Sequence, residues 1–301
     1  MLKLTDIDMT STHAQNRTDK PTSTFRQLKR LLVALVVSCA AGFVHADIPD
    51  EAINAYQRGD YAKAYALVLP LAEAGSASAE FALGIMYGNG HGVRQDHREA
   101  AAWYRKAAEQ GHPSAQTNLG FMYGEGQGVP QDHREAAAWY RKAAEQGVPR
   151  AQFNLGVMYD NGQGVPQDHR EAAAWYRKAA EQGDPRAQAN LGFMYDNGRG
   201  IPQDYREAAA WYRKAAEQGD PLAQANLGSL NELGVGLPEN PVLAYMLYNL
   251  SAAQGNEKAA NNRSRIIDRL TKAQLDEAQA LTRNWKVGQP LPTKSKTYKS
   301  K

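Results

Sequence analysis

The chain has 301 residues, of which 35 are basic and 32 acidic, and it contains a single cysteine. One cysteine cannot form an intramolecular disulfide, so the fold must be stabilised by packing alone. A formal net charge of only +3 argues against the strongly basic composition that a nucleic-acid-binding domain needs.

Residues 1–46 contain the successive regions of a secretory signal peptide. Basic side chains between Arg26 and Arg30 precede an apolar run that begins at Leu31 and ends in small residues at Ala46. This order predicts export to a periplasm or out of the cell, with cleavage after Ala46. The apolar run is short for a membrane span, so no transmembrane segment is expected in the mature chain.

Two points about the leader stay open. The sequence Val36-Val-Ser-Cys39 resembles a lipobox, so attachment of a lipid through Cys39 is an alternative to soluble export. Residues 1–25 are polar and long for a leader, which leaves open whether translation starts at Met1. Cleavage would remove six basic and three acidic residues and leave 29 of each, so the mature chain is expected to be formally neutral.

Residues 47–77 are predicted to form a shortened helical hairpin. Asp60 and Gly75 stand where the later, longer units have a helix cap and a helix-ending glycine, and only Arg58-Gly59 joins the two helices. Pro70 falls inside the second helix and is predicted to kink it.

Tryptophan recurs every 36 residues, each time within the sequence REAAAWYRKAAEQG, at Trp103, Trp139, Trp175 and Trp211. Self-similarity at this period predicts a tandem array whose units stack, because a single unit cannot bury its own apolar face. Five units can be written in one register, residues 78–113, 114–149, 150–185, 186–221 and 222–257. The fifth is the most divergent and has Leu247 at the tryptophan position.

Each unit is predicted to be a hairpin of two helices, A and B. Helix A begins at a proline such as Pro185, because the first turn needs no N–H donor. Glycines such as Gly162 and Gly164 then turn the chain where a positive φ is needed. Helix B begins at a capping box such as Asp168-x-x-Glu171, and its apolar residues recur at the spacing of one buried face. No strand pattern is found between residues 47 and 285.

The run A-x-x-x-L-G-x-M-Y-x-x-G-x-G-V-x-x-D-x-x-x-A-x-x-W-Y-x-x-A-A-x-x-G, which covers residues 78–257, resembles the Sel1-like repeat family, a relative of the tetratricopeptide repeats. The resemblance implies an all-α fold, a right-handed superhelix (α-solenoid) of antiparallel helical hairpins that holds partners on its concave side. The fifth unit has Leu230-Asn231 in place of Met-Tyr, which suggests a capping role. The cysteine pairs of some secreted members are missing, so their disulfide-locked form is not expected.

Helix A differs among the units at positions 1, 4, 8 and 11, which lie within an arc of about 80° opposite the packing positions. Several of these residues are large and apolar, which predicts a partner that covers them. The predicted groove is an apolar ladder edged by charged residues: Phe81, Ile85, Phe121, Phe153, Val157 and Phe193, with Arg150, Arg186, Asp160 and Asp196. The alternative stays open that these side chains pack between adjacent A helices and varied neutrally after duplication.

A second ladder consists of asparagines within helix A, at Asn118, Asn154, Asn190 and Asn226. Asparagine is a mediocre helix former, so its recurrence there calls for a reason. Either the amides hydrogen-bond the backbone of a bound peptide, or they fasten neighbouring units together.

No pattern for catalysis is found. His97, His133 and His169 recur at the repeat period, so they lie on successive units rather than around one metal ion. The glycine-rich loops lack the Gly-Lys-Ser/Thr sequence and the preceding strand of a phosphate-binding loop. We therefore expect no enzyme activity, no metal and no cofactor.

The sequence favours an exported, non-catalytic scaffold that binds a protein or an extended peptide. Two alternatives stay open: a wall protein that interacts with peptidoglycan or a β-lactam, as some secreted members of the resembling family do, and a secreted effector that binds a host protein. Residues 258–285 are predicted to close the stack with one or two helices, the last of which begins at the capping box Thr271-Lys-Ala-Gln274. The lysine-rich residues 286–301 are predicted to be a disordered tail.

Overall fold

The computed structural model describes residues 48–293, and this part of the chain consists of helices without any β-strand. The predicted all-α class is confirmed. Predictions that concern residues 1–47 and 294–301, among them the signal peptide, cleavage after Ala46 and lipid attachment at Cys39, lie outside the described residues.

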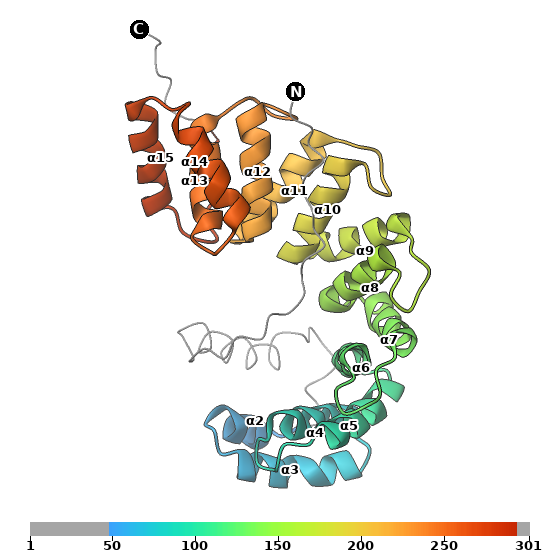
Figure 1. Cartoon of the computed structure of the whole chain (residues 1–301). Coiled ribbons are helices and arrows are strands. Elements are labelled where there is room, and N and C mark those ends of the chain that lie inside the picture. Colours follow the sequence, from blue (N-terminus) through green and yellow to red (C-terminus); the bar gives the residue numbers. More distant parts are fainter. Residues whose placement is uncertain (1–47, 294–301) are drawn as a thin grey trace.

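The helices between residues 48 and 293 are, in chain order, α2 (Asp50–Gln57), α3 (Tyr61–Glu73), α4 (Ala77–Asn89), α5 (His97–Glu109), α6 (Pro113–Glu125), α7 (His133–Glu145), α8 (Pro149–Asn161), α9 (His169–Glu181), α10 (Pro185–Asn197), α11 (Tyr205–Glu217), α12 (Pro221–Leu233), α13 (Pro241–Ala252), α14 (Glu257–Ile267) and α15 (Lys272–Asn284). Each repeat contributes one hairpin, from α4 and α5 in the first to α12 and α13 in the fifth. Each helix from α2 to α13 packs against the next helix along the chain, and the hairpins follow one another along an arc (Figure 1). The result is a solenoid.

The ends of the repeated helices follow from their sequences. Asp132 caps α7, since its side chain accepts hydrogen bonds from the backbone N–H groups of Arg134 and Glu135 at 2.8 and 3.1 Å. This is the aspartate half of the predicted capping box. Helix α8 ends at Gly162, whose φ of 68° lies in the left-handed region that favours glycine.

Two glycines in each repeat permit close packing. A Cβ on Gly156, in the middle of α8, would lie 2.7 Å from Cδ1 of Tyr176, so this glycine lets the tyrosine ring lie directly on the helix backbone. A Cβ on Gly164, in the loop that follows α8, would collide with the backbone carbonyl of His133 at the start of α7. The first contact closes the hairpin, and the second fixes the distance between successive hairpins.

The tryptophans join neighbouring repeats. Trp139 of α7 is buried in a cluster with Tyr104 and Leu119, which lie on α5 and α6. Its ring is covered by the ammonium group of Lys142, 4.0 Å from the ring centroid, one turn further along α7. The indole is therefore a structural part of the stack, as its spacing predicts.

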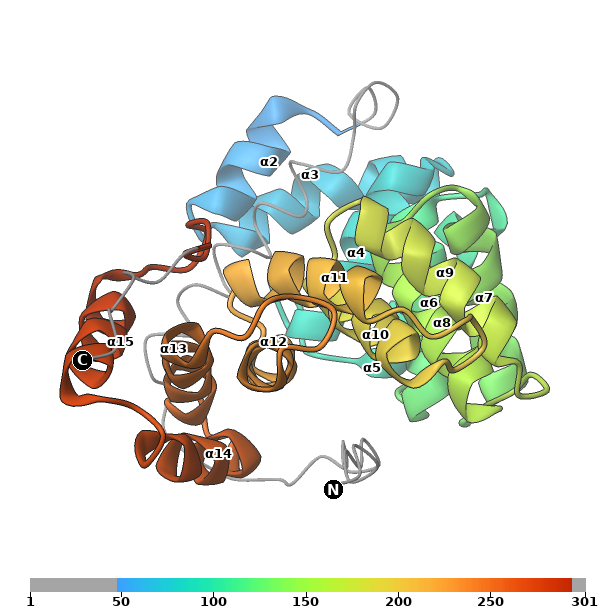
Figure 2. The same ribbon diagram turned by 90° about the horizontal axis from the view of Figure 1, so that it is seen from above.

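Both ends of the array differ from its middle. Helices α2 and α3 form the predicted short hairpin, and α3 continues through Pro70. At the other end α15 packs against α13 as well as following α14, so α13 is enclosed by its neighbours (Figure 2). Thr271 and Gln274 make both halves of the predicted capping box.

The ordered chain continues beyond α15. Residues 286–293, which belong to the segment predicted as a disordered tail, are placed, and Leu291 among them is buried. The remaining residues of that segment, 294–301, lie outside the described part. Between residues 48 and 293, none of the helices has the length and the apolar character that crossing a membrane requires.

Candidate partner-binding face

The varied face consists of the residues at positions 1, 4, 8 and 11 of the A helices α4, α6, α8, α10 and α12. Its most exposed aromatic residue is Phe121, which retains 39% of its surface accessible. Arg150 and Arg186 are also exposed, whereas the other predicted apolar members of the ladder are half-buried: Phe81, Ile85, Phe153, Val157 and Phe193. The face is thus neither an open apolar groove nor a closed core.

Position 4 packs on the tyrosine of helix B in the same hairpin. The Phe81 ring lies 5.8 Å from that of Tyr104 and is stacked on His112, with centroids 4.5 Å apart. Phe153 lies 5.9 Å from Tyr176 in the same way. These phenylalanines therefore cover the hairpin core with one ring face and direct the rest of the ring outwards.

The two arginines at position 1 connect adjacent A helices. The guanidinium carbon of Arg186 lies 4.2 Å from the ring centroid of Phe153, and that of Arg150 lies 5.9 Å from Phe121. Arg186 also pairs with Asp184 at 2.7 Å. Because the contact to Phe121 is the longer one, Phe121 stays more accessible than Phe153.

Three further residues of the ladder both pack within the array and reach its surface: Ile85, Val157 and Phe193. Each packs against a buried cluster, Ile85 against that of α5 and α6, Val157 against that of α7 to α10, and Phe193 against that of α11 to α13. Their half-burial shows that they stabilise the array as well as lining its surface.

The two predicted acidic residues do not lie along an open edge. Asp160 accepts from Arg199 of the next repeat at 3.3 Å and contacts the His169 Nδ1 at 3.0 Å. Asp196 is only 6% exposed and accepts a hydrogen bond of 3.3 Å from the Tyr212 hydroxyl. Burial raises the pKa of the Asp196 carboxyl. This differs from the expectation, because Asp196 is a hairpin contact and is not available at the rim of a groove.

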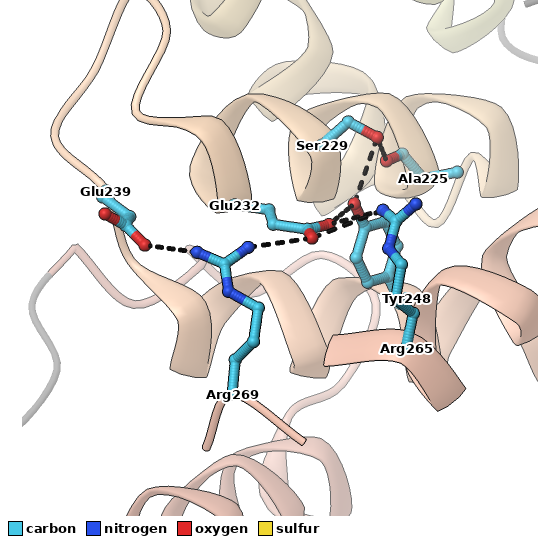
Figure 3. A network of polar contacts seen from close by, with 7 residues as sticks. All are labelled: Ala225, Ser229, Glu232, Glu239, Tyr248, Arg265 and Arg269. Carbon is cyan, nitrogen blue, oxygen red and sulfur yellow. Dashed lines mark hydrogen bonds and ion pairs between the residues drawn. The ribbon is translucent and has the colours of Figure 1, made fainter. Parts of the chain in front are cut away.

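The C-terminal end of the varied face is an ion-pair network around Glu232, the position-11 residue of the fifth repeat (Figure 3). Glu232 is 5% exposed and accepts from Arg265 and Arg269 at 3.2 and 3.1 Å, and from the Tyr248 hydroxyl at 2.7 Å. Burial is the main cause that raises the pKa of Tyr248. The network ties α12, α13 and α14 together and ends the array.

Sequence reasoning missed this network. One available signal was Glu232 itself, because the other repeats have glycine or aspartate at position 11. The other was Arg265, which follows Ser229, the position-8 residue of the fifth repeat, by one repeat length. The pattern becomes visible only when α14 is aligned as the A helix of a sixth, degenerate unit.

Each asparagine of the ladder interacts with a tyrosine of the preceding repeat. The amides lower the pKa of the helix B tyrosine hydroxyls of the preceding repeat, Asn118 for Tyr104, Asn154 for Tyr140, Asn190 for Tyr176 and Asn226 for Tyr212, against the larger effect of burial, which raises it. This interaction is the kind expected if asparagine joins the units, and the binding of a peptide backbone by these amides stays a prediction.

A buried glutamine ladder, which the sequence analysis did not predict, makes a second set of joints. Gln116 donates to the Ala108 carbonyl of the preceding repeat at 3.1 Å and accepts from Gln146 at 2.8 Å. Gln146 also donates to the Gly111 carbonyl at 3.0 Å. The recurrence of glutamine at position 3 and in the AEQG sequence was the signal for it.

The titratable side chains on and near the varied face are engaged in contacts within the protein. Between residues 48 and 293, no three His, Cys, Asp or Glu side chains gather where they could hold a metal ion. His169 is held by Asp160, and His112 caps α6 by accepting from the Ala115 N–H group. Burial lowers the pKa of His112 to about 4, so this imidazole is neutral at physiological pH.

The repeat pattern identifies the family. The Sel1 repeat model matches five consecutive stretches, residues 77–112, 113–148, 149–184, 185–220 and 221–256, which together make up more than half of the chain. The chain belongs to the Sel1 repeat family. Sel1 repeat proteins are mainly non-catalytic and generally serve as scaffolds for protein–protein interaction.

Solved structures of Sel1 repeat proteins are similar in both sequence and fold. A protective antigen present in uropathogenic Escherichia coli strains, which displays an SLR fold, is 36% identical over 85% of this chain and 54% of its own, with a TM-score of 0.71. A Sel1 repeat protein from Oxalobacter formigenes is 38% identical over 68% of this chain and 84% of its own, with a TM-score of 0.64. This chain thus spans about half the length of the E. coli antigen. None of the curated proteins matches it.

Proposed function

We propose that this Sel1 repeat protein is an exported, non-catalytic scaffold that binds a protein or an extended peptide along the varied face of its first three repeats. The observation that carries the proposal is the environment of Phe121. This ring is 39% exposed on the same varied face as the half-buried Phe81 and Phe153, and the guanidinium carbon of Arg150 lies 5.9 Å from its centroid. Aromatic and arginine side chains of this kind anchor protein interfaces.

The proposed site is centred on the first two repeats, and the third repeat contributes Arg150 and Phe153 at its border. Position 11 is glycine in the first two repeats, at Gly88 and Gly124, so this position places no acidic side chain beside Ile85 and Phe121. At the other end Glu232 is already saturated by two arginines and a tyrosine.

Export is the part of the proposal that rests on the leader. The basic and apolar order of residues 26–46 supports it, and the description of the E. coli relative as a protective antigen is consistent with a location outside the cytoplasm. Fractionation of cells that produce the full chain should place a shortened form, lacking residues 1–46, in the periplasm or the medium. Recovery of the uncleaved chain from the cytoplasm would refute this part.

Site-specific photocrosslinking tests the binding face. A benzophenone amino acid replaces Phe121 in one variant and Leu233 in the control, which is 54% exposed but lies outside the varied face. We expect a defined protein adduct from position 121 alone, and an affinity of the purified adduct partner that falls about 30-fold or more in Phe121→Asp. Equal adducts from both positions, or an unchanged affinity in Phe121→Asp, would contradict the proposal.

The same variants distinguish the wall-binding alternative. Retention of the purified protein on isolated peptidoglycan, to the same extent in Phe121→Asp and in the unaltered chain, would favour a glycan or muropeptide ligand bound elsewhere. Phe153→Asp adds a further check, because lost thermal stability with unchanged partner capture would assign the ladder to packing alone.

A further inference from the structure

The segment after α15 folds back onto α11 and is held there through its backbone. The Arg213 guanidinium donates to the Leu291 carbonyl at 3.1 Å, and the Leu291 N–H donates to the Glu217 carboxylate at 2.9 Å. Further upstream the Gly288 N–H donates to the Glu217 backbone carbonyl at 2.7 Å. Both main-chain polar groups of Leu291 are thus bound by two side chains that lie one turn apart on the same helix.

The Leu291 side chain is the apolar part of this contact. It is 2% exposed and belongs to the buried cluster formed by α11, α12 and α13. Residues 286–290 are all exposed, although Val287 lies against Gly219 at the end of α11. One leucine therefore provides most of the specific apolar contact between this segment and the repeats.

The same arginine has a different partner in the first three repeats. There it donates to a tyrosine hydroxyl of the next A helix, in the pairs Arg105 with Tyr123, Arg141 with Tyr159 and Arg177 with Tyr195. In the fifth repeat the tyrosine position is occupied by Asn231, which instead donates to the Leu227 carbonyl of its own helix at 2.8 Å. Arg213 is consequently left without a tyrosine, and Leu291 supplies both the acceptor and the apolar group.

We propose that the surface of α11 around Arg213 and Glu217, the α11 slot, is a binding site for an extended peptide with leucine between two prolines, which residues 286–293 of the chain itself occupy. The donor and the acceptor on α11 match the C=O and N–H groups of any extended residue, and the buried cluster selects the leucine. Pro290 and Pro292 have no N–H donor that the slot would have to satisfy, and they limit the freedom that an extended peptide loses on binding.

The attachment is of a kind that a competing peptide can displace. The segment follows the last helix, is held at one buried side chain and three hydrogen bonds, and is exposed over five consecutive residues. A tethered segment competes through its high local concentration, so a free peptide of the same sequence should bind weakly until the tethered one is removed.

Fluorescence anisotropy with a labelled synthetic peptide of residues 285–293 tests the proposal. We expect the full chain carrying Leu291→Asp to bind this peptide at least about tenfold more tightly than the unaltered chain, because its own segment no longer fills the slot. Adding Arg213→Ala to Leu291→Asp should weaken binding by about tenfold, and a peptide with aspartate for leucine should not bind. Adding Arg177→Ala, the equivalent arginine of the third repeat whose partner is Tyr195, is the matched control and should leave the affinity unchanged.

Equal affinity of the unaltered chain and the Leu291→Asp chain, or no binding by a Leu291→Asp chain with unchanged circular dichroism, would overturn the proposal. If that variant fails to fold, Asn231→Tyr provides the test. It restores to Arg213 the partner found in the other repeats, so the amides of Gly288 and Leu291 should exchange with solvent at least about tenfold faster while the helices stay protected. Unchanged protection of these two amides would refute the α11 slot.

Discussion

The varied face is built differently at its two ends, on hairpins that are otherwise nearly identical. Position 8 is apolar in the first four repeats, but position 11 is glycine only in the first two, at Gly88 and Gly124. In the last three repeats position 11 is acidic, as Asp160, Asp196 and Glu232, and each of these carboxylates is bonded within the protein. The scaffold is shared, so the two ends differ in how far the side chains of the varied face are paired within the protein.

Under the proposed function, this difference separates the end that binds a partner from the end that closes the array. At the acidic end the charged side chains are paired with other side chains of the array. They therefore hold neighbouring helices together and are not available to a ligand. At the apolar end Phe121 has only a distant arginine above it, so a partner could gain by covering it. Changes at the two ends should therefore affect different measurements, and the following predictions test this from the largest expected effect to the smallest.

Acid should weaken the first two repeats more than the last ones, because the cap of α6 is His112 where α12 has Asp220. The pKa of His112 is about 4 in the fold and 6.5 when unperturbed, so the unfolded chain binds the extra proton first. Between pH 6.5 and 4, the free energy of unfolding should fall by about 3 kcal/mol relative to a His112→Asn variant, which retains a cap acceptor. Urea titrations at pH 7 and pH 4 measure the difference.

Asp220 provides the contrast to His112. Burial raises the pKa of its carboxyl, so protonation on acidification favours the folded state at that cap. On acidification, an Asp220→Asn variant should therefore lack the stabilisation that protonation of Asp220 gives the unaltered chain. His112→Asn should instead lack the destabilisation that protonation of His112 causes. The same pH profile for both variants would show that the two caps do not differ as described.

Glu232→Ala should lower the free energy of unfolding by about 2 kcal/mol. Removing one partner of a buried pair costs about 3–5 kcal/mol, but Arg265 and Arg269 are half-exposed and can turn to water, which reduces the loss. The loss should be confined to α12, α13 and α14, so hydrogen exchange should accelerate there and not in α4 to α7. A uniform acceleration along the array would contradict the assignment of Glu232 to the closing end.

Arg186→Ala should lower the free energy of unfolding by about 0.5–1 kcal/mol, since Arg186 lies 4.2 Å from the Phe153 ring centroid and its head is half-exposed. Arg150→Ala should cost less because its guanidinium is 5.9 Å from Phe121. Thermal denaturation of the two variants gives the comparison, and a larger loss in Arg150→Ala would show that Phe121 is held more tightly than its exposure indicates.

Phe121→Asp should change the free energy of unfolding by less than about 0.5 kcal/mol, because the side chain is already 39% exposed. Calorimetry of this variant beside Phe153→Asp sharpens the comparison between an accessible and a covered ring. A loss of stability in Phe121→Asp as large as in Phe153→Asp would remove the argument for a partner at this residue.

The hairpin fold could be predicted from the sequence because the repeated residues act over short distances. Asp132 caps its own helix, Gly162 ends its own helix, and Trp139 recurs at a spacing that places it on every buried face. Each of these assignments needs only helix geometry and the period of 36 residues.

The varied face could be predicted only in part, since burial there depends on neighbouring helices. A helical wheel places Asp196 and Phe121 on the same arc, but it cannot show that the Tyr212 hydroxyl reaches Asp196 from the helix behind. The docking of Leu291 on α11 joins residues 74 to 78 positions apart, a separation at which no sequence periodicity operates. A composition rich in lysine and proline therefore predicted a free tail where part of it is bound.

The repeated joints have an evolutionary consequence. Gly164 against the His133 carbonyl, and Gln116 against the Ala108 carbonyl, recur in equivalent form at the other inner boundaries, so a copied hairpin would find matching surfaces on both sides. In-frame recombination between copies can thus lengthen or shorten the arm without new compensating substitutions. The hairpin that carries Asn231 has to remain last, and we expect natural length variants to differ in the number of central copies while retaining both ends.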